Sequence, residues 1–388
     1  MTTRAHQGLC HAVLAARVAG MIGDPVLRLR FLKVMRRPPA CKPWRRFRFW
    51  IVWPALLLAV MVFLLAKHAA GKPKAPPVVA IRAELPLISE VPKPASVWQV
   101  EKSAGSEVYS NGLRIDTRFE VASHPRSYLA FPNSTAGSRV PTRRSMPAGI
   151  VFHTSESPQA PFEAGETSAL KRLGESLLDY VRRKSAYHYL IDRFGRVYRV
   201  VAESDAANHA GYSVWADDNW LYLNLNESFL GVSFEAQTPS RQGAEVVSPA
   251  QVRSAAMLTE MLRSIYQIPA GNCVTHAQVS VNPSNMQIGY HTDWATDFPF
   301  AALGLPDNYV RALPSLRIFG FEYDPRLYGS PDHRISAGVG LAEQDFLRAA
   351  AVAGLQPAAY RKTLQQRYRE YLAEARRGGQ GQPEEDDK

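Results

Sequence analysis

The sequence is poor in cysteine, with 3 among 388 residues. Cys10 and Cys41 precede the one long apolar segment, and Cys273 stands alone after it. A disulfide framework and a zinc site built from cysteine pairs are therefore excluded. The C-x-x-H spacing of Cys273 and His276 leaves a metal-binding role open for Cys273, against the alternative of a small buried strand residue.

Acidic residues are almost absent from residues 1–72, which contain 13 Lys and Arg and a single acid, Asp24. This excess is larger than the net charge of the whole chain, +11, so the remaining residues are close to neutral. A basic chain can indicate nucleic-acid binding, but here the charge is confined to one terminus. No nucleic-acid partner is predicted.

Charge is missing altogether from residues 49–66, FWIVWPALLLAVMVFLLA. A stretch of this length is near the lower limit for crossing a bilayer. Basic residues crowd its N-terminal side, and the positive-inside rule then leaves residues 1–48 in the cytoplasm. We expect a single-pass protein of the inner (cytoplasmic) membrane whose globular part is extracytoplasmic, in the periplasm.

Two alternatives concern this N-terminal region. A cleaved signal peptide would need small residues before its cleavage site, where the sequence has Lys67 and His68. Met35 opens a compact basic leader of its own, so residues 1–34 need not belong to the natural protein.

Composition divides the chain into segments, and no internal repeat is found. In order they are a basic leader (1–48), a transmembrane anchor (49–66), a proline-rich linker (67–96), a small β-rich element (97–148), an α/β domain (149–305), a loop and helical extension (306–377) and a polar, acidic tail (378–388). Alternating residues around Asn111-Gly112 predict a hairpin in the β-rich element.

The α/β domain is predicted from interleaved strand and helix patterns. Residues 149–153 form a short apolar run that ends at a histidine, two alternating strands flank Phe194-Gly195, and another strand starts at Gly231. Ser248-Pro249 caps one helix. A second, over residues 167–184, has an apolar stripe of Leu170, Leu173, Leu177, Tyr180 and Val181. We expect a mixed central sheet flanked by helices.

Two further helices are predicted near the C-terminus. One covers residues 341–353 and stops at Gly354, and the other opens at Pro357. The second has an apolar face of Tyr360, Leu364, Tyr368, Tyr371 and Leu372. This pair either packs against the main domain, which is the default interpretation, or docks a partner.

Residues 288–300, IGYHTDWATDFPF, carry the most specific chemical signal. Asp293 lies there, downstream of the isolated histidines His153 and His276. Two imidazoles and one carboxylate from separate segments make a three-ligand zinc site with an open fourth position, as a catalytic zinc requires. His291 is the alternative third ligand, with Asp293 then its hydrogen-bonded partner.

These motifs resemble those of a known family. The series FHT, SAYHYLIDRFGRVYRVV, NHAG, NESFLGVSFEA, TH and HTDWATDFPF is similar to the zinc N-acetylmuramoyl-L-alanine amidases of type 2, over about residues 149–300. These share their fold with phage-type amidases and peptidoglycan recognition proteins. The resemblance implies zinc-dependent hydrolysis of the amide between N-acetylmuramic acid and L-alanine, in peptidoglycan or muropeptides.

The resemblance also implies roles for residues. His153, His276 and Asp293 match the metal ligands, Tyr187 matches a tyrosine that some members use beside the metal, and His209 matches a histidine of the substrate groove. His291 stands where hydrolytic members often have lysine, which predicts a role as donor to the oxyanion and a more pH-sensitive enzyme.

This sequence departs from the family pattern at three points. Trp294-Ala295 replaces Pro-Gly, the interval from His276 to Asp293 is longer than usual, and Ser233 replaces a glutamate. Glu235, two residues further on the same strand face, is interpreted as structural.

Other interpretations stay open. Tyr187 fits an ordinary strand aromatic, and His124 and His188 fit hydrogen-bonded core or surface residues. At the level of function, the alternatives are a non-catalytic peptidoglycan-binding receptor and a tether between membrane and wall.

Overall fold

The computed structural model describes residues 94–133, 140–238, 246–325 and 334–377. All of these fall in one unit, Pro76–Lys388. The predicted leader, the transmembrane anchor, most of the proline-rich linker and the acidic tail lie outside the described residues. Among the residues described, no helix combines the length and apolar character that a membrane crossing needs.

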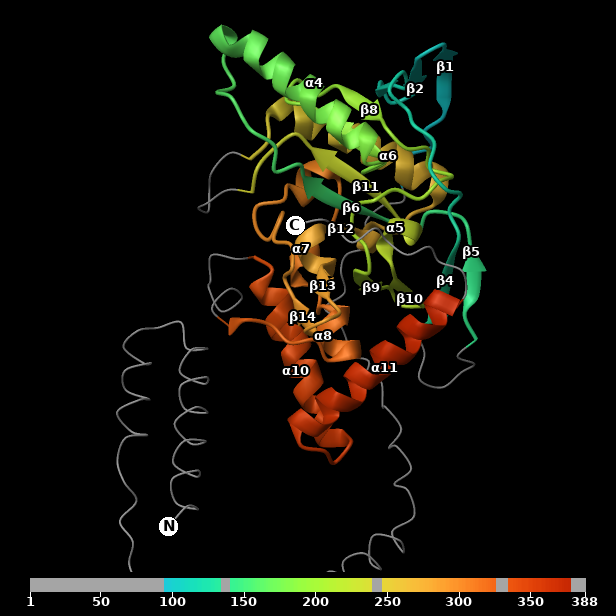
Figure 1. Cartoon of the computed structure of the whole chain (residues 1–388), viewed down its shortest axis with the longest axis vertical. Helices are drawn as coiled ribbons and strands as arrows, with labels where there is room; N and C mark the ends of the chain where they lie inside the picture. Colours follow the sequence, from blue (N-terminus) through green and yellow to red (C-terminus); the bar gives the residue numbers. More distant parts are fainter. Residues whose placement is uncertain (1–93, 134–139, 239–245, 326–333, 378–388) are drawn as a thin grey trace, which may run out of the picture. The chain divides into compact units, whose positions relative to one another are not determined.

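The centre of the described part is a mixed sheet, as predicted (Figure 1). Its strands β7, β11, β6 and β12 run parallel, whereas β8 is antiparallel to β7 and β1, β2 and β3 form antiparallel pairs. Within the described residues it has eight strands, in the order β1 (Gln99–Ser103), β2 (Ser106–Tyr109), β3 (Arg114–Asp116), β8 (Val197–Arg199), β7 (Tyr189–Ile191), β11 (Phe229–Phe234), β6 (Gly149–Thr154) and β12 (Cys273–Thr275).

Two long helices cover opposite faces of this sheet (Figure 1). Helix α4 (Thr167–Arg183) packs Leu177 and Val181 against Leu190 of β7. Helix α6 (Pro249–Tyr266) packs on the other face, where Phe152 and Phe234 lie. Because side chains alternate along a strand, His153 and its register partner Ser233 face the α4 side.

Helix α6 begins where the sequence predicts. The hydroxyl of Ser248 accepts a hydrogen bond from the Gln251 amide, and the Gln251 side chain accepts one from the Ser248 amide. This reciprocal pairing satisfies two donors that a helix start would otherwise leave unpaired. Gln251 also donates to the carbonyls of Ile191 and Glu235, so the cap fastens α6 to two strands of the sheet.

The segment before residue 149 is continuous with this sheet and not a separate layer. The predicted hairpin at Asn111-Gly112 is confirmed as the β2–β3 turn, and β3 then pairs in parallel with β8. A second sheet also joins the segment to the domain, in the order β5 (Thr142–Arg144), β4 (Tyr128–Pro132), β10 (Trp220–Leu223) and β9 (Val214–Ala216). Both connections hold residues 97–148 to the α/β core.

The C-terminal helices pack onto the domain, as the default interpretation expected. They are α8 (Pro314–Phe319), α10 (Ser336–Val352) and α11 (Pro357–Arg377). The predicted apolar face of α11 is buried along its length, and its Tyr371 ring lies 4.9 Å from the ring of Phe131 in β4. Gly320 ends α8 at a φ of 65° and approaches α11 so closely that a Cβ would lie 3.0 Å from the Arg361 carbonyl oxygen.

Shorter elements complete the fold. The helical turns are α5 (Leu225–Ser228), α7 (His276–Val279), η1 (Ala164–Glu166), η2 (Ala270–Asn272), η3 (Phe300–Leu303) and η4 (Asn308–Val310). Strands β13 (Val281–Asn282) and β14 (Gln287–Ile288) form a hairpin inside the interval that separates His276 from Asp293.

Two details of the predicted helices are wrong. Tyr180 is 53% exposed, and Leu178 takes its place in the buried stripe of α4, because the stripe is centred on Leu177 and Val181 and leaves Tyr180 on its flank. Helix α10 starts at Ser336 and not at residue 341, since the small residues Gly338 and Val339 already pack in its first turns.

Candidate metal centre

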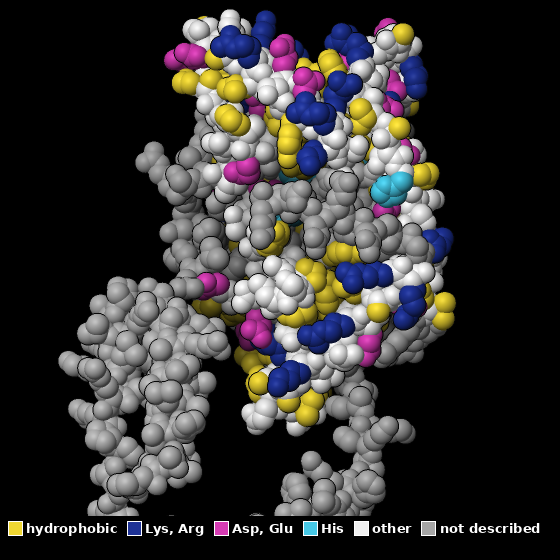
Figure 2. Space-filling model, viewed as in Figure 1, with side chains coloured by type: hydrophobic (Ala, Val, Ile, Leu, Met, Phe, Trp, Pro, Cys, Tyr) yellow, Lys and Arg dark blue, Asp and Glu magenta, His cyan; other side chains and the backbone are white. Residues whose placement is uncertain are grey.

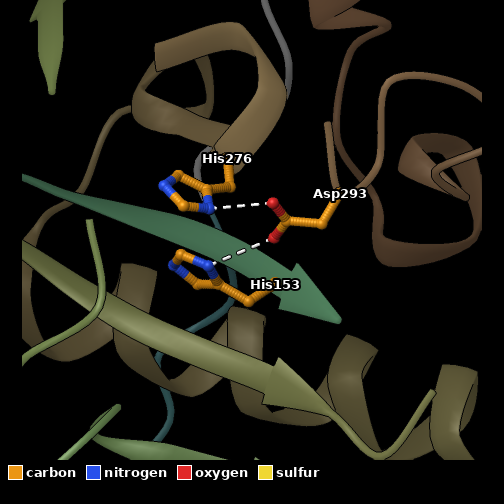
Figure 3. Close-up of side chains that lie close together, drawn as sticks. All are labelled: His153, His276 and Asp293. Atoms are coloured by element: carbon orange, nitrogen blue, oxygen red, sulfur yellow. Dashed lines mark hydrogen bonds and ion pairs between the residues drawn. The ribbon is translucent and has the colours of Figure 1, made fainter. Parts of the chain in front are cut away.

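Three buried side chains from three different elements converge at one end of the central sheet (Figure 3). His153 comes from the end of β6, and His276 opens α7 directly after β12. Asp293 comes from the loop that follows the β13–β14 hairpin. Because β6 and β12 are parallel neighbours, their carboxyl ends bring both histidines to the same edge of the sheet.

The donor atoms of this cluster are close enough to share one ion. The Nδ1 atom of His276 is 2.8 Å from one carboxylate oxygen of Asp293, and the Nδ1 atom of His153 is 3.3 Å from the other. Ligands about 2.0–2.1 Å from a tetrahedral zinc lie roughly 3.3 Å apart. The candidate ligand atoms all lie within 4.8 Å of one another. A metal ion would therefore fit among them after small shifts.

The electrostatics of the cluster also suit a cation. Burial lowers the pKa of His153 to about 4, and the neighbouring His276 lowers it further. Burial by itself would raise the pKa of Asp293, but the two imidazoles that face its carboxylate outweigh this and hold the pKa well below its usual range. The cluster thus presents an ionised carboxylate beside a neutral imidazole in an almost dry environment, and a buried charge of this kind requires compensation.

The loop that carries Asp293 is fixed by the residue that departs from the family pattern. Trp294 adopts a φ of 59° and is 1% exposed, with its ring 5.5 Å from that of Phe234 and 5.2 Å from that of Phe298. The carbonyl of Asp293 accepts a hydrogen bond from Ala277, the residue after His276. Trp294 therefore anchors the loop in the core, while the backbone links Asp293 to the helix that carries its neighbour.

The two residues predicted to be catalytic flank the cluster. The ring of Tyr187 lies 5.0 Å from the ring of His153, and its backbone has a φ of 59°, an unfavourable conformation for a residue with a Cβ. The imidazole of His291 stacks on that of His276 at 4.6 Å, with 21° between the ring planes. Both side chains are half-buried.

His209 lies behind His153. Its Nδ1 atom is 3.2 Å from the Nε2 atom of His153, and its Nε2 atom is 3.3 Å from the carbonyl oxygen of Phe229. Burial lowers the pKa of His209 well below its usual value, and His153 and His188 lower it further. The predicted contact of His209 with substrate stays a prediction, whereas its contact with His153 is a feature of the structure.

The remaining candidates have structural surroundings. His188 is fully buried and accepts a hydrogen bond from Gly231, and the Nε2 atom of His124 is 2.7 Å from Glu227. The carboxylate of Glu235 accepts the backbone N–H of Arg193. These contacts agree with the interpretation of all three side chains as structural.

Two residues that organise this region are not predicted from the sequence. The side-chain oxygen of Asn226 accepts hydrogen bonds from three successive backbone amides, those of His209, Ala210 and Gly211, at 2.7–2.8 Å. Arg126, 2% exposed, donates to the carbonyl of Phe229 from the segment before the α/β domain. The only hint for Asn226 was its place in the NES motif, and for Arg126 the sequence has none.

Comparison with known proteins supports the same region. Residues 143–293 match the family described as N-acetylmuramoyl-L-alanine amidase, Amidase_2. Among curated proteins, no sequence matches the chain.

Solved structures also match the chain, at low sequence identity. AmpDh3 from Pseudomonas aeruginosa, in complex with anhydromuramic pentapeptide, is 21% identical over 45% of this chain and 66% of its own, with a TM-score of 0.29. The N-acetylmuramyl-L-alanine amidase AmiD from E. coli is 19% identical over 67% and 92%, with a TM-score of 0.32. AmpD from Citrobacter freundii is 19% identical over 47% and 88%, with a TM-score of 0.25.

The matched segment ends at Asp293 and contains the three candidate ligands together with Tyr187, His209 and His291. The match over residues 143–293 is to the N-acetylmuramoyl-L-alanine amidase family that the resemblance predicted.

Proposed function

We propose that the protein is a zinc-dependent N-acetylmuramoyl-L-alanine amidase. It hydrolyses the amide bond between the lactyl group of N-acetylmuramic acid and L-alanine, in peptidoglycan or in muropeptides. The observation that carries this proposal is the convergence of His153, His276 and Asp293 inside the segment that matches the amidase family. A receptor that had lost a ligand would not keep this complete donor set.

The three candidate ligands would bind the metal ion that the reaction needs. His153 and His276 would hold the zinc through Nδ1, and Asp293 through a carboxylate oxygen. A bound zinc supplies Lewis acidity toward the scissile carbonyl and a water of lowered pKa. Three protein donors leave a coordination position for water or substrate.

Tyr187 and His291 flank the ligands on different sides, beside His153 and His276 respectively. The phenol of Tyr187 would orient the attacking water or the substrate. The imidazole of His291 would donate a hydrogen bond to the oxygen that becomes negative as the carbonyl is attacked.

The proposal extends to the location of the enzyme. Residues 49–66 would anchor it in the inner membrane, with residues 1–48 in the cytoplasm and the catalytic domain in the periplasm, where peptidoglycan lies. A reporter that is active only outside the cytoplasm should work when fused after Lys72 and fail when fused before Arg45. The reverse pattern would place the domain on the cytoplasmic side.

The surface over α4 carries charges of both signs. In Figure 2, Lys and Arg side chains are interspersed with Asp and Glu over α4, at the top of the view. A nucleic-acid-binding face would instead gather one sign of charge.

Product analysis tests the reaction directly. The full-length protein, purified in detergent and supplied with zinc, is incubated with a muropeptide, and the products are identified by mass spectrometry. The proposal predicts an intact saccharide and a peptide with a free amino group on L-alanine. His153→Ala and His276→Ala should abolish this cleavage.

His124→Ala is the matched control, because it removes an imidazole whose side chain is 58% exposed and which lies outside the metal cluster. It should cleave like the wild type. A folded wild-type protein that binds sacculi but contains no zinc and releases no peptide would be a receptor and not an amidase.

A further inference from the structure

A line of three polar groups runs from the candidate ligand His153 into the core. The Nε2 atom of His153 faces Nδ1 of His209 at 3.2 Å, and Nε2 of His209 faces the carbonyl oxygen of Phe229 at 3.3 Å. His209 lies in a loop, and Phe229 is the first residue of β11. The far end of this line is a backbone carbonyl, whose chemistry does not change with protonation of its neighbours.

That carbonyl determines where the proton of His209 lies. A carbonyl oxygen can only accept a hydrogen bond, so Nε2 of His209 must carry a proton. A neutral imidazole has one N–H, which leaves Nδ1 of His209 as an acceptor for Nε2–H of His153. The Asp293 carboxylate, 3.3 Å from Nδ1 of His153, is a competing acceptor for the one proton of His153. Once Nδ1 of His153 binds a metal this competition ends, and Nε2 carries the proton that His209 accepts.

We propose that His209 is a positioning residue that holds His153 in the tautomer whose Nδ1 can bind a metal. The inference rests on the proposed metal site, since Nδ1 is the nitrogen of His153 that faces Asp293. Partners of this kind fix both the ring orientation and the tautomer of a ligand histidine, and losing one commonly weakens metal binding about 10–100-fold.

The surroundings of His209 hold its ring in place for this role. Asn226 accepts the backbone amide of His209 and those of the next two residues, which fixes the loop. On the other side, a Cβ added to Gly231 would lie 2.6 Å from Cγ of His209. The ring therefore occupies a space that only glycine at this position of β11 leaves open.

Two substitutions at one position separate the hydrogen bond from the packing. In His209→Asn, the amide oxygen takes the place of Nδ1 and can still accept from His153. In His209→Leu, a side chain of similar bulk has no acceptor. Zinc affinity of the detergent-purified, full-length protein is measured by competition with a chelator. His209→Leu should bind zinc about 10–100-fold more weakly than the wild type, and His209→Asn should recover most of this loss.

The tautomers are measured independently of activity. Two-bond ¹H–¹⁵N correlation spectra of the histidine-labelled protein distinguish Nε2–H from Nδ1–H, and the signals are assigned by their loss in His153→Ala and His209→Asn. Wild-type His153 and His209 should both be Nε2–H in the zinc-loaded protein, and His209 should be Nε2–H in the metal-free protein as well. Metal-free His209→Leu should hold His153 as Nδ1–H, because the Asp293 carboxylate is then its acceptor.

Several results would overturn the inference. A proton on Nδ1 of His209, or on Nδ1 of His153 in the zinc-loaded wild type, would contradict it, even if the Leu variant failed to fold. So would unchanged zinc affinity in a folded His209→Leu with a raised KM, which would make His209 a substrate contact only. Equal losses in the Asn and Leu variants would indicate packing. A wild-type protein that takes up no zinc but whose His209 is Nε2–H would refute the proposed function and leave the hydrogen bond from His209 to Phe229 intact.

Discussion

The buried histidines of the described residues form two groups, His153 with His276 and His188 alone, which differ in what their ring nitrogens face. In the first group, Nδ1 of His153 and Nδ1 of His276 both point at the carboxylate of Asp293 (Figure 3). In the second, Nδ1 of His188 accepts the amide of Gly231, and Nε2 lies 2.7 Å from the Arg126 guanidinium. The first group brings two ring nitrogens and a negative charge to one point, whereas the second already contains its own cation.

Burial alone therefore does not identify a metal ligand. His188 is 0% exposed and His153 is 1% exposed, yet their surroundings suit opposite roles. Burial lowers the pKa of His188, and Arg126 lowers it further, because a second positive charge beside the guanidinium is unfavourable. The useful observation is which atoms the two ring nitrogens meet, and this requires the fold.

The largest difference between the two histidine groups should appear when a side chain that binds the metal is removed. His153→Ala should eliminate both bound zinc and detectable turnover, because a site of three ligands rarely keeps its ion after losing one. Zinc content by mass spectrometry and peptide release are the measurements. A variant that retains one zinc per chain would remove His153 from the ligand set.

A smaller effect is expected at His291, which stacks on a ligand but is not one in this interpretation. His291→Ala should keep zinc and lower turnover by about two to three orders of magnitude, as the loss of one oxyanion donor does. His291→Lys should restore part of the rate, since an ammonium can donate the same hydrogen bond.

The opposite pattern of metal loss would reassign the third ligand. If His291→Ala lost zinc while Asp293→Ala kept it, His291 would be the ligand and Asp293 its hydrogen-bonded partner.

A substitution of His188, the second group, should lower the free energy of unfolding and leave the zinc content unchanged. His188→Ala leaves the Gly231 amide without its acceptor, and an unsatisfied buried group costs about 1–3 kcal/mol. Urea unfolding should show this loss, while zinc stoichiometry stays at one. Unchanged stability with lost zinc would place His188 in the metal centre instead.

The sequence predicts features that depend on neighbouring residues better than contacts between residues far apart in the chain. The cap at Ser248, the turn at Asn111-Gly112 and the face of α11 are local signals, and the structure confirms all three. His153, His276 and Asp293 were found because the motifs around them match a family. Residues without such a motif, and contacts between distant residues, were not found.

Long-range contacts explain the omissions. His209 meets His153 across 56 residues, and Arg126 meets the Phe229 carbonyl across 103. No periodicity or composition links such pairs, because only the sheet order brings them together. In the sequence, Trp294 is a departure from the family motif. In the structure it is buried and fixes the loop of Asp293.

The smallest expected effect concerns Glu235, a buried carboxyl whose pKa is raised, whereas the pKa of Asp293 is lowered. Burial raises the pKa of Glu235 to about 7, above the ordinary value of 4.5. A folded-state pKa above the unfolded one means that the stabilising contribution is complete below about pH 4.5 and is lost as the pH rises through about 7. Wild-type stability should therefore fall over this interval.

Glu235→Gln should remove this pH dependence of the stability, and the variant should be more stable than the wild type at pH 8 by about 1–3 kcal/mol. The amide oxygen can still accept the hydrogen bond from the Arg193 backbone. Urea unfolding at pH 5 and pH 8 measures the difference. A slope of the same size in the variant would assign it to other groups. Zinc content should not change.

Zinc K-edge X-ray absorption of the full-length protein tests the metal centre most directly. With His153, His276 and Asp293 as ligands, the first shell should contain only nitrogen and oxygen at about 2.0–2.2 Å, with the outer-shell scattering of two imidazoles. Asp293→Ala should lose the zinc. A sulfur scatterer at about 2.3 Å would assign Cys273 as a ligand, and the absence of zinc from the folded, zinc-supplied protein would contradict the proposed enzyme altogether.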